Sequence, residues 1–151
     1  MLDTILPAVG TTRSTLPSRP VLLATFDVPL TTDSIRLAVE SAVEAGRPLV
    51  VVNVVGGRFF PIPGAPLDAI VTPEVEASLR DPAELAVALG VATERLRVLT
   101  PRPIEALVEL VAERRPSLVV LGPDPARLRR RFWEKAKRRL RERTSCLVWS
   151  A

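Results

Sequence analysis

Five short apolar segments, separated by stretches with helical periodicity, restrict this chain to a small set of folds. The segments occupy residues 21–26, 48–55, 95–100, 117–122 and 145–151. Continuous apolar runs of this length are typical of strands buried on both faces of a parallel sheet. Strands that alternate with helices imply right-handed crossovers. The pattern therefore predicts an α/β fold, a single doubly wound five-stranded parallel sheet with helices on both faces.

Four helices are expected between these strands. The first follows residues 31–33, which are good N-cap candidates, and ends at Gly46 in the place of a helix C′ glycine. Asp81, Pro82 and Glu84 form an N-cap, N1 and capping-box pattern, so the second helix is predicted to begin there. The third is marked by an apolar stripe, and the fourth covers the basic residues 127–143. That stripe consists of Ile104, Leu107, Val108 and Val111.

The ends and the longest connection carry weaker patterns. Residues 1–19 show no periodicity and are predicted to form a flexible N-terminal arm, which leaves residues 20–151 as one domain. Residues 56–73 contain four prolines, three glycines and the adjacent Phe59 and Phe60. Loops of that length are commonly functional or mobile.

Several classes of protein are excluded or disfavoured by residues that the chain lacks. It has no histidine, which removes His-based triads and His-containing metal sites, and Cys146 is its one cysteine. We therefore expect no catalytic residue, no metal and no enzyme. No window of 18 apolar residues occurs, so no transmembrane helix is expected. A membrane surface is not an expected partner either, because the basic helix needs its apolar stripe to cover the sheet. The first residues lack a basic n-region, and a single cysteine suits a reducing compartment, so a cytoplasmic location is expected.

Taken together, the segments "VLLATFD", "LVVVNVV", "PIEALVELVAERRPSLVVLG" and "TSCLVWS" resemble the universal stress protein family over most of residues 20–151. In members that bind ATP, the fourth strand of the fold leads into G-x-x-G, nine residues, and then G with Ser or Thr. Only Gly122 matches, because Pro125, Lys135 and Ala136 occupy the other three positions. The resemblance therefore implies the fold and a stress-associated role, while ATP as a cofactor is disfavoured.

The same resemblance places a nucleotide, if one binds, near Asp27, the backbone of Val54 and Gly122. The residues themselves allow plainer interpretations, in which Asp27 ends a strand in a turn and Gly122 is a turn glycine. The loop chemistry also opposes a phosphate, since Pro123 and Pro125 lack an N–H. Asp124 is predicted to cap the next helix with its own carboxylate.

The basic segment suggests a second kind of site. Residues 127–143 contain ten basic and two acidic side chains, a net charge of +8, whereas the whole chain carries +4. Arg130, Lys137 and Arg141 are the candidate contacts for an anion or a nucleic acid. Against this, alternating charges four residues apart are typical of a solvated helix face, so nucleic acid is not the expected partner. That series is Arg130, Glu134, Arg138 and Glu142, and the apolar stripe is Leu128, Phe132, Ala136 and Leu140 with Trp133 at its edge.

The final segment is predicted to be an edge strand, which is a liability for uncontrolled pairing unless something covers it. In universal stress proteins the closing strand commonly pairs across a two-fold axis. A homodimer through Cys146, Leu147, Val148 and Trp149 is therefore expected, with coverage by the N-terminal arm or by a loop as the alternative. The expected function is a non-enzymatic stress-response protein that acts through dimerisation and through protein or ligand interaction. Nucleotide binding and anion binding remain the two alternatives.

Overall fold

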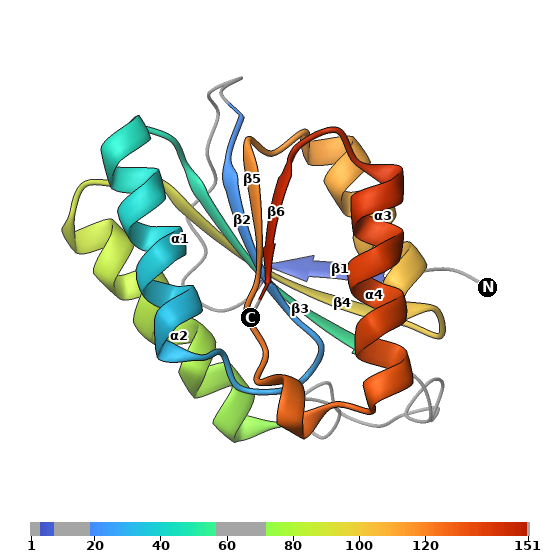
Figure 1. Cartoon of the computed structure of the whole chain (residues 1–151). Coiled ribbons are helices and arrows are strands. Elements are labelled where there is room, and N and C mark those ends of the chain that lie inside the picture. The colour runs from blue at the N-terminus through green and yellow to red at the C-terminus, as the bar shows by residue number, and fades with distance from the viewer. Residues whose placement is uncertain (1–3, 8–18, 57–71, 151) are drawn as a thin grey trace.

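A six-stranded sheet passes through the centre of the computed structural model, which describes residues 4–7, 19–56 and 72–150 (Figure 1). The strand order is β1-β4-β3-β2-β5-β6, and every pairing among the last five strands of that order is parallel. The predicted doubly wound five-stranded parallel sheet is thereby confirmed. Its strands are β2 (Val21–Thr25), β3 (Leu49–Gly56), β4 (Thr93–Thr100), β5 (Leu118–Leu121) and β6 (Leu147–Ser150).

The sixth strand, β1 (Thr4–Pro7), was not expected from the sequence. It pairs antiparallel with β4 in a register that runs from Thr4 opposite Leu99 to Pro7 opposite Leu96. The prediction of a flexible arm missed this strand because four residues are too few to show a period, and the partner strand lies about ninety positions away. The rest of that arm before Arg19, and the Phe59–Phe60 pair, lie outside the described residues.

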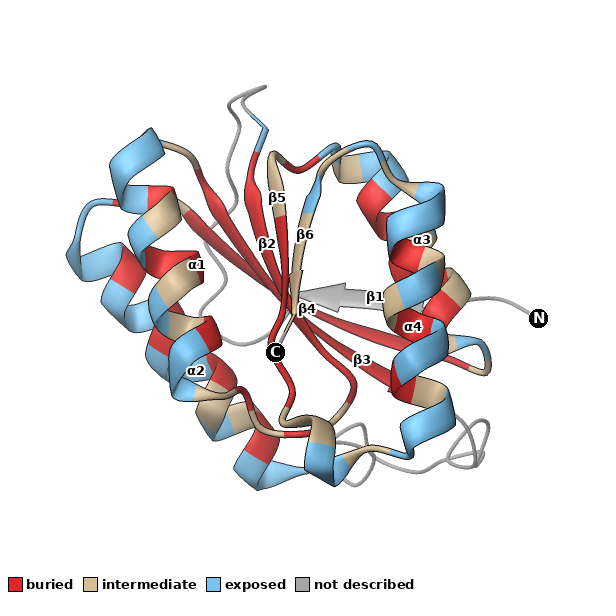
Figure 2. Ribbon diagram, viewed as in Figure 1, coloured by how far each residue is buried: buried red, intermediate tan, exposed pale blue. Residues whose placement is uncertain are grey.

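Two helices cover each face of the sheet (Figure 1). On one face lie α1 (Thr32–Ala45) and α2 (Pro73–Ala88), and on the other α3 (Pro103–Arg114) and α4 (Arg130–Arg143). Because side chains alternate along a strand, Val21 and Leu23 point into the first layer while Leu22 and Ala24 point into the second. Figure 2 shows the parallel strands largely buried and the outer faces of the helices exposed.

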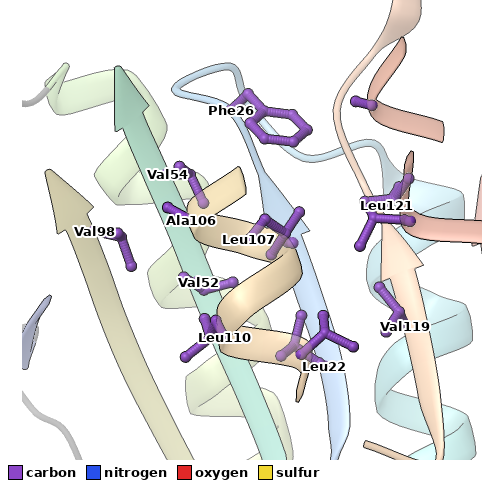
Figure 3. Close-up of a cluster of buried hydrophobic side chains, with 14 of the residues drawn as sticks. Leu22, Phe26, Val52, Val54, Val98, Ala106, Leu107, Leu110, Val119 and Leu121 are labelled. Carbon is purple, nitrogen blue, oxygen red and sulfur yellow. The ribbon is translucent and has the colours of Figure 1, made fainter. Parts of the chain in front are cut away.

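The larger of the two hydrophobic clusters fills the space between the sheet and α3 and α4. Figure 3 shows Leu107 and Leu110 of α3 above Leu22, Val52 and other strand residues. Leu22 and Leu107 are fully buried, and burial of such a side chain contributes about 1.5–3 kcal/mol. This layer holds the strand ends in place, and the candidate site is built on those ends.

Helix boundaries agree with the sequence for α1 but not for α2. Thr31 caps α1 by accepting a hydrogen bond from the Ser34 backbone N–H, and Gly46 ends it with a left-handed φ of 63°, as expected. The predicted start of α2 at Asp81 was wrong, since the helix begins at Pro73 and continues through Pro82. An internal proline costs about 3 kcal/mol. The helix tolerates it because one stripe, formed by Val75, Leu79, Ala83 and Ala86, is buried along its whole length.

The basic segment also divides differently from the prediction. A short 3₁₀ helix, η2 (Pro125–Arg127), precedes α4, which starts only at Arg130. Trp133, which was expected at the edge of the apolar stripe, is buried in the core with Ala136 and Leu140. Phe132 and Leu128 are only partly buried, and the Phe132 ring meets Phe26 edge-on at 5.0 Å. Among the described residues, no helix is both long and apolar enough to cross a membrane.

Candidate functional site

The strand order reverses its direction at β2, and that reversal defines where a ligand would bind. From β2 the chain passes through α1 to β3 on one side, while β5 flanks β2 on the other side. In doubly wound sheets the crevice beyond the carboxyl ends of the strands at this point is the usual ligand site. The residues to consider are therefore those that follow β2, β3 and β5.

Asp27 follows β2 and is held in an uncommon backbone conformation. Its φ of 54° lies in the left-handed region, which aspartate and asparagine tolerate better than most residues. The Asp27 backbone N–H donates to Asn53 Oδ1 at 2.8 Å, and Asn53 Nδ2 donates back to Asp27 Oδ1 at 3.4 Å. Thr72 Oγ1 donates to the other carboxylate oxygen at 3.4 Å. Asp27, Asn53 and Thr72 thus form what we call the polar cluster.

Burial raises the pKa of the Asp27 carboxyl above its ordinary value of 3.8. The hydrogen bonds from Asn53 and Thr72 favour the charged form and lower that pKa, while the carboxylate of Glu76 raises it further. Glu76 is itself paired with Arg97 of β4 at 2.9 Å. A partly buried carboxylate with a raised pKa at a switch point is a typical feature of functional sites.

Asn53 is the member of the polar cluster that the sequence analysis missed. It lies fully buried on β3, between valines, and its side chain reaches the backbone of a residue 26 positions earlier. The available signal was one amide in the otherwise apolar "LVVVNVV". A buried amide needs partners, so this residue in a central strand already indicated a contact beyond the strand end.

Gly122 follows β5, and its backbone is fully engaged by neighbouring elements. Its N–H donates to Ala24 O at 2.8 Å, and its carbonyl accepts from Thr31 N at 2.8 Å and from Ser34 Oγ at 3.1 Å. An added Cβ would collide with the Leu30 side chain and lie 2.9 Å from Ser34 Oγ. Its φ is not in the positive range, so close packing, and not the predicted turn conformation, is what requires glycine here.

The loop that continues from Gly122 uses its own donors. Ala126 N donates to Asp124 Oδ1 at 3.0 Å, Arg127 N to Asp124 O at 3.0 Å, and Leu128 N to Pro125 O at 3.2 Å. Pro123 and Pro125 have no N–H, so six of the seven positions from Gly122 to Leu128 have none to offer a phosphate. Asp124 caps η2, the short 3₁₀ helix, as an N-cap residue.

The last two positions of the ATP motif, which follow nine residues after the second glycine position, lie in a helix and not in a loop. Lys135 and Ala136 both lie within α4, and Ala136 is fully buried in the core. Val54, the third candidate contact, has a buried side chain in the larger hydrophobic cluster and is paired with Val98 in the register of β3 with β4. Of the three predicted contacts, Asp27 alone presents a polar side chain in this crevice.

The basic helix face does not gather its charges into one site. Lys137 pairs with Glu134 at 3.2 Å and lies 5.4 Å above the Trp133 ring, and Arg141 donates to Ser150 Oγ at 3.0 Å. Arg139 pairs with Glu105 of α3 at 2.9 Å. The predicted series of alternating charges is present only as Arg138 with Glu142, at 4.0 Å. Arg130 is exposed at the start of the helix.

The final strand lies at the edge of the sheet, as predicted, and pairs with β5 alone among the described strands. Leu147 is 75% exposed. Val148 and Cys146 are partly buried against the larger hydrophobic cluster, and Trp149 against the smaller one. The strand thus has an inner surface that holds it to the sheet and a free edge that no described residue covers.

Comparison with known proteins gives one family and several related structures. The model of the "Universal stress protein family" matches residues 17–149. A universal stress protein from Archaeoglobus fulgidus is 19% identical and has a TM-score of 0.61, with 88% of this chain and 93% of that chain covered. One in complex with cAMP is 21% identical with a TM-score of 0.58, covering 88% and 95%.

A third structure, again from Archaeoglobus fulgidus and in complex with dAMP, is 18% identical with a TM-score of 0.53, covering 89% and 98%. At these identities the structures establish a common fold. Comparison with curated protein sequences gives no match.

Proposed function

The chain belongs to the universal stress protein family, and from this premise we propose that it acts as a non-enzymatic homodimer that binds partners without holding ATP. We assign it no catalysed reaction, because the chain contains no histidine and only one cysteine. The proposed location is the cytoplasm, because a single cysteine suits a reducing compartment. Nucleic acid and membranes are not among the proposed partners, since Lys137, Arg139 and Arg141 are engaged within the fold.

One observation carries the part of the proposal that concerns ATP. The loop after β5 offers almost no free N–H, and the Asp124 carboxylate occupies the position where an anion would be received. A phosphate bound there would need these donors and would meet a negative charge. We therefore expect millimolar ATP to leave the melting temperature of this protein unchanged, because only a ligand that binds the folded state raises it.

The assay needs a positive control and has a clear contrary outcome. The Archaeoglobus fulgidus protein that was crystallised with dAMP serves as the control, with dAMP as its ligand. A saturable rise in the melting temperature with ATP in the present protein, lost in the variant Asp27→Ala, would overturn the proposal.

The polar cluster supports a second candidate, recognition of a nucleoside without its phosphates. Asp27 is held in place by Asn53 and Thr72, and it retains carboxylate lone pairs that can accept from ribose or base. Two structural neighbours were solved with cAMP and dAMP. This candidate predicts equal affinity for adenosine, AMP and ATP by isothermal titration, and loss of all three in Asp27→Ala. Affinity that rises with the number of phosphates would contradict it.

The homodimer is proposed from the edge strand. Pairing of β6 with its copy across a two-fold axis would satisfy the free backbone edge and cover Leu147 in one step. In place of deleting the strand, which would expose both hydrophobic clusters, the test is the single variant Leu147→Glu. Its side chain is exposed in one chain, so the fold is expected to survive while the two charges oppose each other at the axis.

Sedimentation then separates the outcomes. The unmodified protein should sediment as a dimer and Leu147→Glu as a monomer with an unchanged circular dichroism spectrum. Leu89→Glu is the matched control, because Leu89 is 54% exposed at the end of α2, which packs against β3 and β4. A variant Leu147→Glu that stays dimeric would show that β6 is not the interface.

A further inference from the structure

A cavity of about 450 Å³ lies at the amino ends of β5 and β6, whereas the polar cluster lies at the carboxyl ends of the strands. It forms where α3 and α4 end and where the chain turns back into the sheet, at the upper edge of the molecule in Figure 1. We call it the arginine cavity, after three of the residues that line it. The lining consists of Arg19, Val111, Ala112, Arg115, Pro116, Arg143, Thr144, Ser145 and Cys146.

The charge of the arginine cavity is positive and is not balanced by its walls. Arg19, Arg115 and Arg143 contribute three guanidinium groups, and no residue of the lining is acidic. The carboxyl ends of α3 and α4 oppose these charges with about half a negative charge each. Roughly two positive charges therefore remain, so capping of the helix ends accounts for only part of the arginine content.

Among the described residues, Arg115 and Arg143 have no acidic partner. Arg19 is tied to the backbone, with Nε donating to Arg115 O at 3.3 Å and Nη2 to Pro116 O at 3.2 Å. By contrast, no carboxylate of the described residues lies within ion-pair distance of Arg115 or Arg143. The neighbouring Arg114 is paired with Glu94 and does not line the cavity.

The backbone at Arg115 is a second, independent observation. Arg115 ends α3 with a φ of 48°, in the left-handed region where glycine is the usual residue. Gly46 ends α1 in that ordinary way. An arginine there accepts a conformational cost that glycine would avoid, and non-glycine residues held in such conformations are concentrated at ligand sites.

From these features we propose that the arginine cavity binds a small molecule with at least two anionic groups, carboxylate or phosphate. Arg115 and Arg143 supply the planar, two-pronged donors that both groups accept, and the Ser145 hydroxyl is a further donor in the lining. A volume near 450 Å³ is within the range of small-molecule sites, which is roughly 300–1,000 Å³. The proposal does not depend on whether a nucleotide binds at the polar cluster, because that cluster lies at the carboxyl ends of the strands and the arginine cavity at the amino ends of β5 and β6.

Cys146 provides the means of testing the site, because it is free and lines the cavity. It is also the one cysteine of the chain. The full-length protein is labelled with a neutral maleimide at constant ionic strength while inorganic pyrophosphate or citrate is titrated in. Either anion, when bound, should slow the labelling of Cys146 in a saturable manner. Protection by pyrophosphate alone identifies phosphate as the recognised group, protection by citrate alone identifies carboxylate, and protection by both identifies a general polyanion site.

Charge-removing variants then locate the site. In Arg115→Gln with Arg143→Gln, the anion concentration that gives half protection should rise about ten- to a hundred-fold, because two charge-assisted interactions are lost. Arg36→Gln, which changes an exposed arginine of α1, should leave it unchanged. No saturable protection with either anion, or equal protection in all variants, would overturn the proposal.

Discussion

The loops after β2 and after β5 both lie at the carboxyl ends of the parallel strands, but their polar groups make different contacts. The β2 loop keeps a partly buried carboxylate, Asp27, supported by Asn53 and Thr72. The β5 loop directs nearly all its N–H groups to its own atoms or to the sheet, and Leu30 packs over Gly122. The β2 loop therefore keeps a hydrogen-bond acceptor at the strand ends, while most N–H groups of the neighbouring β5 loop are already engaged.

The largest change in stability is expected where Leu30 packs against the β5 loop. Leu30→Ala removes a side chain that is 8% exposed and touches Gly122, and it should lower the free energy of unfolding by about 2–5 kcal/mol in urea denaturation. Leu85→Ala, at a position that is 47% exposed, is the control and should change it by less than about 1 kcal/mol.

A double variant that combines Leu30→Ala with Gly122→Ala tests the contact between the two residues directly. Gly122→Ala alone should cost about 1–3 kcal/mol by overpacking against Leu30, and less in the Leu30→Ala background. Additive costs would mean that the two residues do not meet as the structure indicates.

The next largest effect concerns the support of Asp27. Asn53→Ala leaves the Asp27 backbone N–H without its acceptor and should lower the free energy of unfolding by about 1–3 kcal/mol. Thr72→Val removes only a long, exposed hydrogen bond of 3.4 Å, so its cost should stay below about 1 kcal/mol. If Thr72→Val costs as much as Asn53→Ala, the β3 amide is not what holds the polar cluster.

A smaller change should come from the cap of the β5 loop. Asp124→Ala removes the acceptor for Ala126 N and should cost about 0.5–2 kcal/mol. ATP should still leave the melting temperature unchanged, because one released N–H does not make a phosphate cradle. Asp81→Ala, an exposed control on α2, should change stability by about 0.5 kcal/mol or less. ATP binding gained by Asp124→Ala would show that the carboxylate alone keeps the nucleotide out.

The smallest effect is one of pH dependence. Because the pKa of Asp27 is raised in the folded protein, its protonated form is favoured on folding. That contribution is fully present below pH 3.8 and is lost as the pH rises through the raised pKa. Asp27→Asn, which tolerates the same backbone conformation, should therefore gain stability relative to the unmodified protein as the pH is raised toward neutrality. A stability difference that stays constant or falls with pH would contradict the burial of the carboxylate.

Much of this fold could be predicted because its signals are local. The apolar runs form the five parallel strands, and α1 begins after Thr31 and ends at Gly46, as their residue types indicate. The exceptions are places where a distant element decides the outcome. The helix does not begin at the N-cap pattern of Asp81, because burial of a stripe that starts at Val75 extends it toward its amino end. The strand β1 forms because it pairs with β4, which is distant in the sequence. Trp133 is buried with Ala136 and Leu140, while Phe132 is only partly buried, at the rim of the same cluster, where its ring meets Phe26.

Local residue types suffice to predict the strand–helix alternation and the missing donors at two positions of the β5 loop. Pro123 and Pro125 lack an N–H in any fold, and the chain has no histidine in any fold. Which distant residues come into contact depends on the folded sheet. It placed Asn53 under Asp27 across 26 positions and Ser34 against Gly122 across 88, and it brought Arg19, Arg115 and Arg143 around one cavity. Covalent and periodic properties belong to a residue and its neighbours, whereas these contacts exist only after the sheet has brought remote segments together.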